Sequence, residues 1–488
     1  MTTSASGDWA TPYGADTTTI MGRIDGKPLT GGRSFDILNP ANEQVIGQGV
    51  AASPEQVQAA LTSSAAAFET WRFSPVQQRS AILHRAAALM RDKAQELALT
   101  LTLEQGKPLA QALVEIQISA EALDWFAGAA LRIDGRVMPG RTPGARQITV
   151  PEPIGPVAAL TPWNFPALLA VRKIGPALAA GCTVVLKPAE ETPAITVAIA
   201  DAFAQAGLPD GVLNLVFGNA AEISSALIAS PVIRKVSFTG SVPVGKLLAE
   251  QAGRHMKPCT LELGGHAPVL VMDDADPVKA AAASVLGKSR NSGQVCTSPT
   301  RFFVQDAVHD RFLSAFTEGM AALKVGDGTQ PGMDMGPLAN GRRITAMEEL
   351  VADAIQRGAK LMTGGARIGN RGYMFEPTVL AGVPDDAMIM SSEPFGPIAI
   401  VNRVADLDEA LAKANSVSVG LAGYAFTDSQ TRAVAIANRL EVGMLAINNF
   451  AVSQIEAPFG GVKDSGYGYE GGPEGLSHYL HHKLVHHA

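Results

Sequence analysis

One cysteine of this chain lies in a polar segment that could present it to a reactant. The chain has three cysteines, and Cys296 stands in the sequence RNSGQVCTS at residues 290–298, not in an apolar strand. A thiol in such a segment is either incidental or a nucleophile. A nucleophilic thiol needs a base and a donor that stabilises an oxyanion, so the rest of the sequence has to supply both.

A carboxylate and an amide are candidates for these two tasks. Glu262 lies in the apolar stretch LELGG, where burial would raise its pKa toward that of a useful general base. Asn164 follows Trp163 just beyond a predicted strand, and a primary amide there can donate to an oxyanion. Taken alone, each residue has an alternative interpretation, as an edge-strand glutamate facing water or as a turn asparagine. Their occurrence with a loop cysteine favours catalysis.

The elements that must position these residues alternate between strand and helix. Strand-like runs such as PVAAL, CTVVLK and RKVSF alternate with helical patterns from residue 156 to about 254. A second alternating region runs from residue 268 to about 450. This pattern is typical of parallel sheets that helices cover on both faces. The sequence therefore predicts an α/β fold with two doubly wound domains.

The two ends of the chain have a different texture. Residues 54–106 carry apolar residues at helical spacing, and this pattern continues to about Ile133. The first 25 or so residues are polar and rich in Thr, Ser and Gly, so we expect a loose arm. The ending YLHHKLVHHA alternates weakly and predicts a solvated edge strand rather than a metal site. We expect no bound metal.

Composition excludes several classes of protein. Hydrophobic residues make up 47% and charged residues 17% of the 488 residues, which predicts a large buried core. The net charge of −7 argues against nucleic-acid binding. No signal peptide and no membrane-spanning run is expected. The odd number of well separated cysteines excludes a disulfide framework and fits a reducing cytoplasm.

Two glycine-rich motifs resemble nucleotide-binding signatures but lack their context. GYGYEG at 466–471 matches GxGxxG, yet too little chain follows for a βαβ unit. GSVPVGK at 240–246 lacks the following Ser or Thr of a P-loop. The latter segment can still bind an anion, because a strand ends at Gly240 and Ser241 and a helix begins there. A plain turn capped by Ser241 is the alternative.

Six motifs in order give a resemblance to a known family. TPWNFP, GCTVVLKPAEETP, VSFTGS, LELGG, GQVC and EPFGP resemble the aldehyde dehydrogenase superfamily, from about residue 35 to the C-terminus. The resemblance implies a Rossmann-like cofactor domain, a catalytic domain and a small β oligomerisation element. The boundaries expected for these are 1–130 with 154–262, then 263–470, and finally 131–153 with 471–488.

The resemblance also implies catalytic roles. Cys296 matches the nucleophile that attacks the aldehyde carbon, and Asn164 with the backbone N–H of Cys296 matches the oxyanion site. Hydride then passes to a nicotinamide, and Glu262 matches the base that activates water to hydrolyse the thioester. Lys173 and Glu470 match positions that relay protons in relatives.

The resemblance implies a nicotinamide cofactor as well. A Glu at position 190 accepts from both ribose hydroxyls and repels a 2′-phosphate, so NAD is favoured, with NADP possible. The expected cofactor-binding residues are Thr161, Pro162, Trp163, Lys187, Glu190, Gly218, Gly240, Ser241, Leu263, Glu393 and Phe395.

The substrate suggested by this resemblance is an aldehyde with a distal carboxylate. In succinate semialdehyde dehydrogenases an Arg, an Arg and a Ser at the positions of Arg172, Arg290 and Ser453 hold that carboxylate, and Phe459 lies in the following APFGG segment. Internal salt bridges of the arginines are the alternative. The sequence does not separate succinate semialdehyde from 2-oxoglutarate semialdehyde, and a broad aldehyde dehydrogenase or a non-catalytic binding protein on this fold are the other hypotheses.

Relatives form homodimers or homotetramers through the β element, so a homo-oligomer is expected without a choice between the two. Two positions depart from many relatives. His266 follows LELGG, where we expect a core residue rather than a catalytic one. Ser298 stands where some succinate semialdehyde dehydrogenases carry a second cysteine, so no disulfide switch is predicted.

Overall fold

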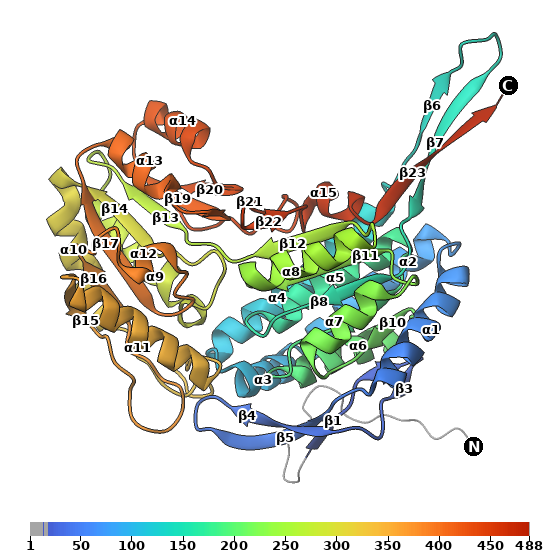
Figure 1. Ribbon diagram of the computed structural model, residues 1–488, viewed down its shortest axis with the longest axis horizontal. Helices are drawn as coiled ribbons and strands as arrows, with labels where there is room; N and C mark the ends of the chain where they lie inside the picture. The colour runs from blue at the N-terminus through green and yellow to red at the C-terminus, as the bar shows by residue number, and fades with distance from the viewer. Residues whose placement is uncertain (1–12, 14–17, 488) are drawn as a thin grey trace.

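Two large sheets and the helices around them form the body of the molecule (Figure 1). The computed structural model describes residue 13 and residues 18–487. Helices in the first half of the chain are α1 (Pro54–Trp71), α2 (Val76–Asp92), α3 (Ala94–Gln105), α4 (Leu109–Ala130), α5 (Pro166–Ala180), α6 (Pro193–Gln205), α7 (Ala220–Ala229) and α8 (Val242–Arg254). Helices in the second half are α9 (Pro277–Ser289), α10 (Asp306–Ala321), α11 (Gly341–Gln356), α12 (Met388–Ser391), α13 (Leu407–Asn415), α14 (Gln430–Arg439) and α15 (Gly472–Ser477).

The first sheet has eight strands in the order β22-β12-β11-β8-β9-β10-β2-β3. Its parallel centre consists of β8 (Val157–Leu160), β9 (Val184–Lys187), β10 (Leu213–Leu215), β11 (Lys235–Gly240) and β12 (Cys259–Leu263). Side chains alternate between its faces: Ala159 joins the core under α2–α6, whereas Ala158 and Leu160 join the core under α1, α7 and α8. Burial on both faces explains the apolar run of β8 and most of β9.

The order of the strands reverses beside β8. The chain runs outward from β8 through β9 and β10, then returns to place β11 and β12 on the other side of β8. Ligands of open α/β sheets bind at the carboxyl ends of strands at such a switch point. The residues that follow β8 and β11 therefore face the expected cofactor site.

The second sheet has seven strands in the order β15-β16-β17-β14-β13-β19-β20. These are β13 (Pro268–Val271), β14 (Arg301–Gln305), β15 (Lys360–Thr363), β16 (Thr378–Ala381), β17 (Ile398–Val404), β19 (Ala422–Phe426) and β20 (Met444–Ile447), parallel except for β15. Helices α9 and α10 cover one face, and α11 to α14 cover the other. The predicted α/β class with two doubly wound sheets is confirmed.

A three-stranded sheet projects from the body (Figure 1). It contains β6 (Arg136–Pro139), β7 (Arg146–Pro153) and the C-terminal β23 (Leu480–His487), which pairs antiparallel with β7 along its whole length. The edge strand predicted from the tail is confirmed. The three strands lie within the ranges 131–153 and 471–488, and the second range also contains α15.

Small β elements complete the fold. They are β1 (Thr18–Ile20), β2 (Arg23–Ile24), β3 (Lys27–Pro28), β4 (Ser34–Asn39), β5 (Gln44–Val50), β18 (Val419–Gly420), β21 (Val462–Lys463) and β22 (Gly466–Tyr467). Strand β22 pairs with β12 in the first sheet, although the expected domain boundaries place it with the second.

The expected loose arm of about 25 residues is wrong for its later part; its start, residues 1–12 and 14–17, lies outside the described residues. Strand β1 pairs with β5, and β2 pairs with β10 of the first sheet. Ile20 is buried, and Arg23 forms an ion pair with Asp201 at 2.9 Å. These contacts reach far along the chain, so local composition could not reveal them. No helix within the described ranges is long and apolar enough to cross a membrane.

Candidate active site

Two adjoining cavities lie between the sheets, at the switch point beside β8. The inner cavity, of about 430 Å³, is lined by Pro162, Trp163, Asn164, Thr239, Gly240, Ser241, Glu262, Leu263, Gly264, Cys296, Asn340, Arg342, Arg343, Glu393 and Phe395. The structure thus brings together Cys296, Glu262 and Asn164, the three residues that the sequence singled out first. The outer cavity, of about 880 Å³, is lined by Lys187 and Glu190 among others and shares Trp163 and Ser241 with the inner one.

The loop before Cys296 is held in an unusual backbone conformation. A 3-10 turn at Arg290–Gly293 contains Asn291 and Ser292 with φ of 48° and 54°. Gly293 also has a positive φ, and a Cβ there would meet the Gly396 carbonyl at 2.1 Å. Side-chain bonds hold the turn: the Asn291 N–H donates to Gln111 at 2.8 Å, and the Ser292 hydroxyl donates to Gly336 at 2.8 Å. Such conformations persist where surrounding contacts determine them, often at functional sites.

Asn164 is positioned by a buried network that the sequence did not reveal. Its Nδ2 donates to the Gln294 carbonyl at 3.1 Å, which leaves its second N–H without a partner among the described residues. Its backbone carbonyl accepts from Lys107 Nζ at 2.7 Å and from Asn291 Nδ2 at 2.9 Å. Lys107 in turn pairs with Glu115 at 2.6 Å, and both side chains are buried. Asn164 is therefore held in place both through its side-chain amide and through its backbone carbonyl.

The backbone N–H of Cys296 makes no hydrogen bond within the described part of the chain. The Asn164 amide and this N–H are the two donors expected at the oxyanion site. Gly265 lies against the same loop, since a Cβ there would approach the Cys296 carbonyl to 2.9 Å. Gly264 allows the Glu393 carboxylate to approach β12, because a Cβ would meet it at 2.3 Å. The two glycines of LELGG thus permit the close packing of the site.

Glu262 is a buried carboxylate with free oxygen atoms. It lies at the end of β12, is 3% exposed, and neither of its carboxylate oxygens has a hydrogen-bond partner in the described structure. Burial and the neighbouring Glu470 raise its pKa well above the ordinary value, while Lys173 and Arg172 oppose this shift. A carboxylate with a raised pKa in a cavity has the properties of a general base.

Lys173 and Glu470 form an ion pair in the same region, in which Lys173 Nζ contacts a Glu470 carboxylate oxygen. Lys173 Nζ also donates to the Thr239 hydroxyl at 2.8 Å. Both members of the pair are buried, and the second oxygen of Glu470 has no partner among the described residues. The pair lies outside the cavity lining but acts on the pKa of Glu262.

The thiol of Cys296 is protonated in its resting environment. Burial and the charges of Glu393 and Glu262 together raise its pKa to about 12, against the opposing charges of Arg172 and Arg290. Burial also raises the pKa of Glu393 to about 8. Forming the thiolate therefore requires a base, and Glu262 lines the same cavity.

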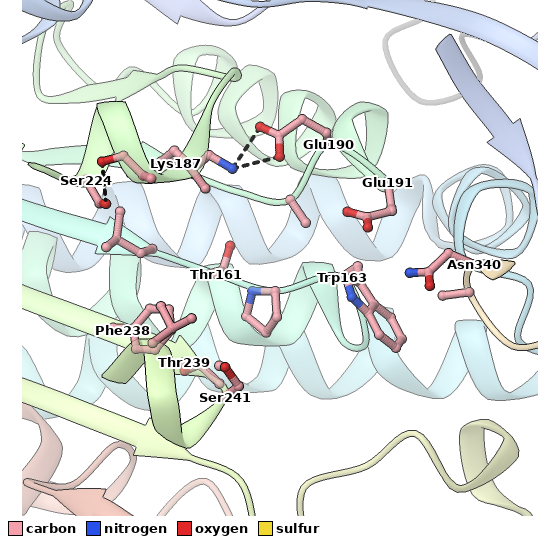
Figure 2. Close-up of a pocket in the computed structure, with 18 of the residues that line it drawn as sticks. Thr161, Trp163, Lys187, Glu190, Glu191, Ser224, Phe238, Thr239, Ser241 and Asn340 are labelled. Atoms are coloured by element: carbon pink, nitrogen blue, oxygen red, sulfur yellow. Dashed lines mark hydrogen bonds and ion pairs between the residues drawn. The ribbon is translucent and has the colours of Figure 1, made fainter. Parts of the chain in front are cut away.

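The outer cavity holds most of the predicted cofactor residues (Figure 2). Lys187 Nζ donates to Glu190 at 2.8 Å, and the two side chains lie on the cavity wall. Gly218 lies outside the lining; its N–H donates to Glu190 at 2.9 Å and holds that carboxylate in place. The Thr161 hydroxyl is buried in the wall without a partner among the described residues.

The turn between β11 and α8 meets the requirement for an anion site. Ser241 is the N-cap residue of α8, as the alternative of a plain capped turn expects, but its side chain makes no capping hydrogen bond. Ser241 and Val244 line the outer cavity. Free N–H groups and the helix dipole there favour phosphate. Trp163 and Phe395, whose rings meet edge-on at 5.6 Å between centroids, stand at the inner end with Glu393.

The predicted substrate residues lie beyond the cavity lining. Arg172 Nη2 donates to the Ser453 hydroxyl at 2.7 Å, and its guanidinium lies over the Phe459 ring at 4.5 Å. Arg290 is exposed and lies over the Phe165 ring at 5.1 Å. Neither arginine lines the cofactor cavities, but the charges of both lower the pKa of Cys296. The alternative of internal salt bridges finds no carboxylate partner for either arginine in the described structure.

His266 is a core residue, as expected from the sequence. It is 2% exposed, and its Nε2 lies 2.8 Å from the carbonyl of Ile389. Ser298 accepts from the buried Lys288 at 3.2 Å. Within the described residues, no three His, Cys, Asp or Glu side chains gather as a metal site.

Lys107→Gln should disturb the oxyanion site more than binding. Loss of the cation removes one of the two donors to the Asn164 carbonyl and leaves the buried Glu115 without its counter-ion, so we expect kcat to fall about 10–100-fold with little change in KM. Steady-state kinetics and thermal unfolding test this. Lys413→Gln, which removes a surface pair with Asp385, is the control. A large change in KM alongside the fall in kcat, or an unchanged kcat, contradicts the role of Lys107 in positioning Asn164.

Comparisons with known proteins agree with this geometry. The model of the "Aldehyde dehydrogenase family" matches residues 29–485. The chain is 49% identical to the 4-(hydroxymethyl)benzenesulfonate dehydrogenase of Comamonas testosteroni over 450 residues, covering 92% of this chain and 94% of the relative. It is 41% identical to the NADP(+) succinate-semialdehyde dehydrogenase of Escherichia coli over 454 residues, covering 93% of this chain and 94% of that relative.

Solved structures give the same answer. The crystal structure of an NAD-dependent aldehyde dehydrogenase from Sinorhizobium meliloti superposes with a TM-score of 0.95 at 34% identity, covering 97% of this chain and 95% of that one. Relatives of this chain thus use NAD or NADP. The chain belongs to the aldehyde dehydrogenase family and is an NAD(P)-dependent aldehyde dehydrogenase.

Proposed function

We propose that this enzyme oxidises an aldehyde that carries a distal anionic group to the corresponding acid, with Cys296 as the covalent carrier. The observation that supports the proposal is that two arginines with no carboxylate partner among the described residues, Arg172 bonded to Ser453 at 2.7 Å and the exposed Arg290, act electrostatically on the Cys296 thiol. Guanidinium groups and a hydroxyl in the neighbourhood of one reactive atom suit a carboxylate on the other end of a short substrate.

The chain's own residues account for the chemistry in order. Glu262 takes the proton of the Cys296 thiol, and the thiolate adds to the aldehyde carbon. The oxyanion that forms is stabilised by the free N–H of Asn164 and the backbone N–H of Cys296. A bound NAD(P) would supply the acceptor for the hydride that leaves that carbon. Glu262 then removes a proton from water, which attacks the thioester and releases the acid. Lys173 and Glu470 carry the proton away from Glu262.

The cavities fit the cofactor that the family requires. Lys187 and Glu190 would hold the adenosine ribose, Ser241 and the α8 N-terminus the phosphates, and Glu393 and Phe395 the nicotinamide end. The Glu190 carboxylate is held by Lys187 and by the Gly218 N–H at the outer end. A carboxylate fixed in this way repels a 2′-phosphate, which favours NAD over NADP. The remaining predicted residues, Pro162, Trp163, Gly240 and Leu263, supply walls of the inner cavity.

A carboxylated semialdehyde, succinate semialdehyde first and 2-oxoglutarate semialdehyde as the alternative, is the leading substrate. A second candidate is an aromatic aldehyde with a sulfonate group. It is favoured by the 49% identity to a relative named for 4-(hydroxymethyl)benzenesulfonate and by the aromatic rings of Phe165 and Phe459 beneath the two guanidinium groups. Both candidate substrates carry an anionic group at the end opposite the aldehyde. This anionic group distinguishes both of them from uncharged aldehydes.

The arginines can be tested by the ratio of two substrates. Arg290→Gln and Arg172→Lys should each lower kcat/KM for succinate semialdehyde at least about tenfold relative to hexanal, since a charge-assisted hydrogen bond contributes about 1.5–3 kcal/mol. Arg254→Gln, a surface arginine paired within α8, is the control. Equal effects on charged and uncharged aldehydes would mean that the arginines act on the thiol alone, and the proposal of an anion clamp would fail.

Association through the projecting sheet is also proposed. Val137 and Leu484 on β6 and β23 are 69% and 61% exposed. Exposed apolar side chains on an edge strand favour pairing with another copy, so a homodimer or homotetramer is expected.

The domain boundaries stated from the sequence, 1–130 with 154–262 and 263–470, are proposed for the cofactor and catalytic domains. Three free thiols fit a reducing compartment such as the cytoplasm.

A further inference from the structure

An ion pair crosses the mouth of the cofactor cleft. Arg342 is near the start of α11, which packs on the second sheet, and its Nη2 donates to Glu191 at 2.9 Å. Glu191 lies a few residues beyond β9 of the first sheet, and both residues line the outer cavity. Figure 2 shows Glu191 across the cavity from Ser241, beside Trp163 and Asn340. The pair therefore joins the two halves of the molecule over the cleft.

Arg342 stands where the two cavities meet. The residues that line both are Pro162, Trp163, Thr239, Gly240, Ser241, Asn340 and Arg342. Among these shared residues, Arg342 carries the only charge. A dinucleotide that extends from Glu190 to Cys296 must pass this junction, and its middle is the phosphate chain. The α8 N-terminus supplies neutral donors on the opposite wall, but it supplies no cation.

The guanidinium of Arg342 is free to change partners. Its side chain is 80% exposed, and Glu191 is its one partner within the described residues. Exposed ion pairs of this kind are weak. The next residue, Arg343, is partly buried and contacts the Pro394 carbonyl, so it is committed to the wall beside Glu393. Of the two arginines, Arg342 is thus the one whose guanidinium can exchange its partner for a ligand.

We propose that Arg342 binds the phosphate chain of the cofactor and that Glu191 holds the guanidinium in place until the cofactor arrives. A guanidinium fork matches phosphate oxygens in two parallel hydrogen bonds. A phosphate chain competes directly with the Glu191 carboxylate for those donors. This inference rests on the cofactor site proposed above, but it is independent of the aldehyde.

The test is a set of dissociation constants measured by calorimetry on the full-length enzyme without aldehyde. Arg342→Gln should weaken NAD and ADP-ribose about tenfold, as expected for the loss of a charge-assisted contact. Adenosine, which lacks phosphate, should bind unchanged. Glu191→Gln should tighten NAD severalfold, because the competitor is removed. Arg439→Gln, whose partner Asp408 lies outside both cavities, is the matched control.

The outcomes separate this inference from the proposed function. Equal NAD affinity of wild type and Arg342→Gln overturns the inference while leaving the cofactor site intact. A loss confined to NADP also overturns it, because the arginine would then contact the 2′-phosphate. If the wild-type protein binds no dinucleotide, the cofactor site itself is refuted. Weaker NAD binding in Glu191→Gln would show that the ion pair supports the site and would contradict the competition.

Discussion

Cys296→Ser is expected to lower kcat by at least about a thousandfold, because a hydroxyl is a far weaker nucleophile and a poorer acyl carrier than a thiol. The effect should be on the chemical step alone. NAD should bind the variant with the wild-type affinity, since Cys296 lines the inner cavity but not the outer one and the serine is nearly isosteric. Stopped-flow measurement of NADH formation and calorimetry of NAD binding check the two statements.

Cys259→Ser is the matched control for this variant. Cys259 is half-buried at the start of β12 and lies outside both cavities. Its replacement should leave kcat within about twofold, as for a substitution away from the site. Activity of Cys296→Ser near the wild-type level, or loss of activity in Cys259→Ser instead, would refute the assignment of the nucleophile.

Glu262→Gln is expected to trap the acylated enzyme. Without the base, acylation should slow as well, but hydrolysis of the thioester should slow more, by about 10²–10⁴-fold, because water is a far weaker acid than a thiol and depends more on a base, so that NADH formation ends after about one equivalent per active site. Intact-protein mass spectrometry should show the added acyl group on Cys296. The wild-type rate should rise with pH through the neutral range, because Glu262 and Cys296 both have a raised pKa and act as the deprotonated forms. In the pH–rate profile of thioester hydrolysis, the variant should lack the rise that comes from deprotonation of Glu262.

The same substitution should not destabilise the fold. A carboxyl with a folded-state pKa above its unfolded value contributes stability below the unfolded pKa, and this is lost as pH rises through the folded pKa. At neutral pH the buried Glu262 therefore lowers the stability of the fold. The neutral amide should leave the Tm of the variant equal to or above that of the wild type. Glu250→Gln, on the exposed face of α8, is the control. Continuous turnover with no acyl-enzyme in Glu262→Gln would refute the role of the base.

Parts of the site could be predicted because their signals are local. Glu262 stands out as a charge in an apolar strand that ends in two glycines, and those glycines are needed for contacts with Glu393 and Cys296. The strand and helix alternation likewise predicted both sheets. The order of strands in each sheet, which creates the cavities, depends on crossovers that no local pattern records.

Other parts could not be predicted because their contacts are distant in sequence. Lys107 reaches the Asn164 carbonyl across 57 positions, and Asn291 reaches it across 127. The local sequence around Lys107 predicts only the end of a helix. A lysine next to Gly106 followed by proline gives no sign of burial. The positive φ of Asn291 and Ser292 is equally hidden, since neither is glycine.

The central claim is that a distal anion selects the substrate, and one comparison tests it most directly. Values of kcat/KM for the wild-type enzyme with saturating NAD would be measured for succinate semialdehyde, 2-oxoglutarate semialdehyde and 4-formylbenzenesulfonate, against hexanal and benzaldehyde. We expect at least one anionic aldehyde to exceed its uncharged counterpart by about tenfold or more, which equals about 1.4 kcal/mol of transition-state discrimination. Equal or higher values for hexanal and benzaldehyde would contradict the claim and indicate a broad aldehyde dehydrogenase.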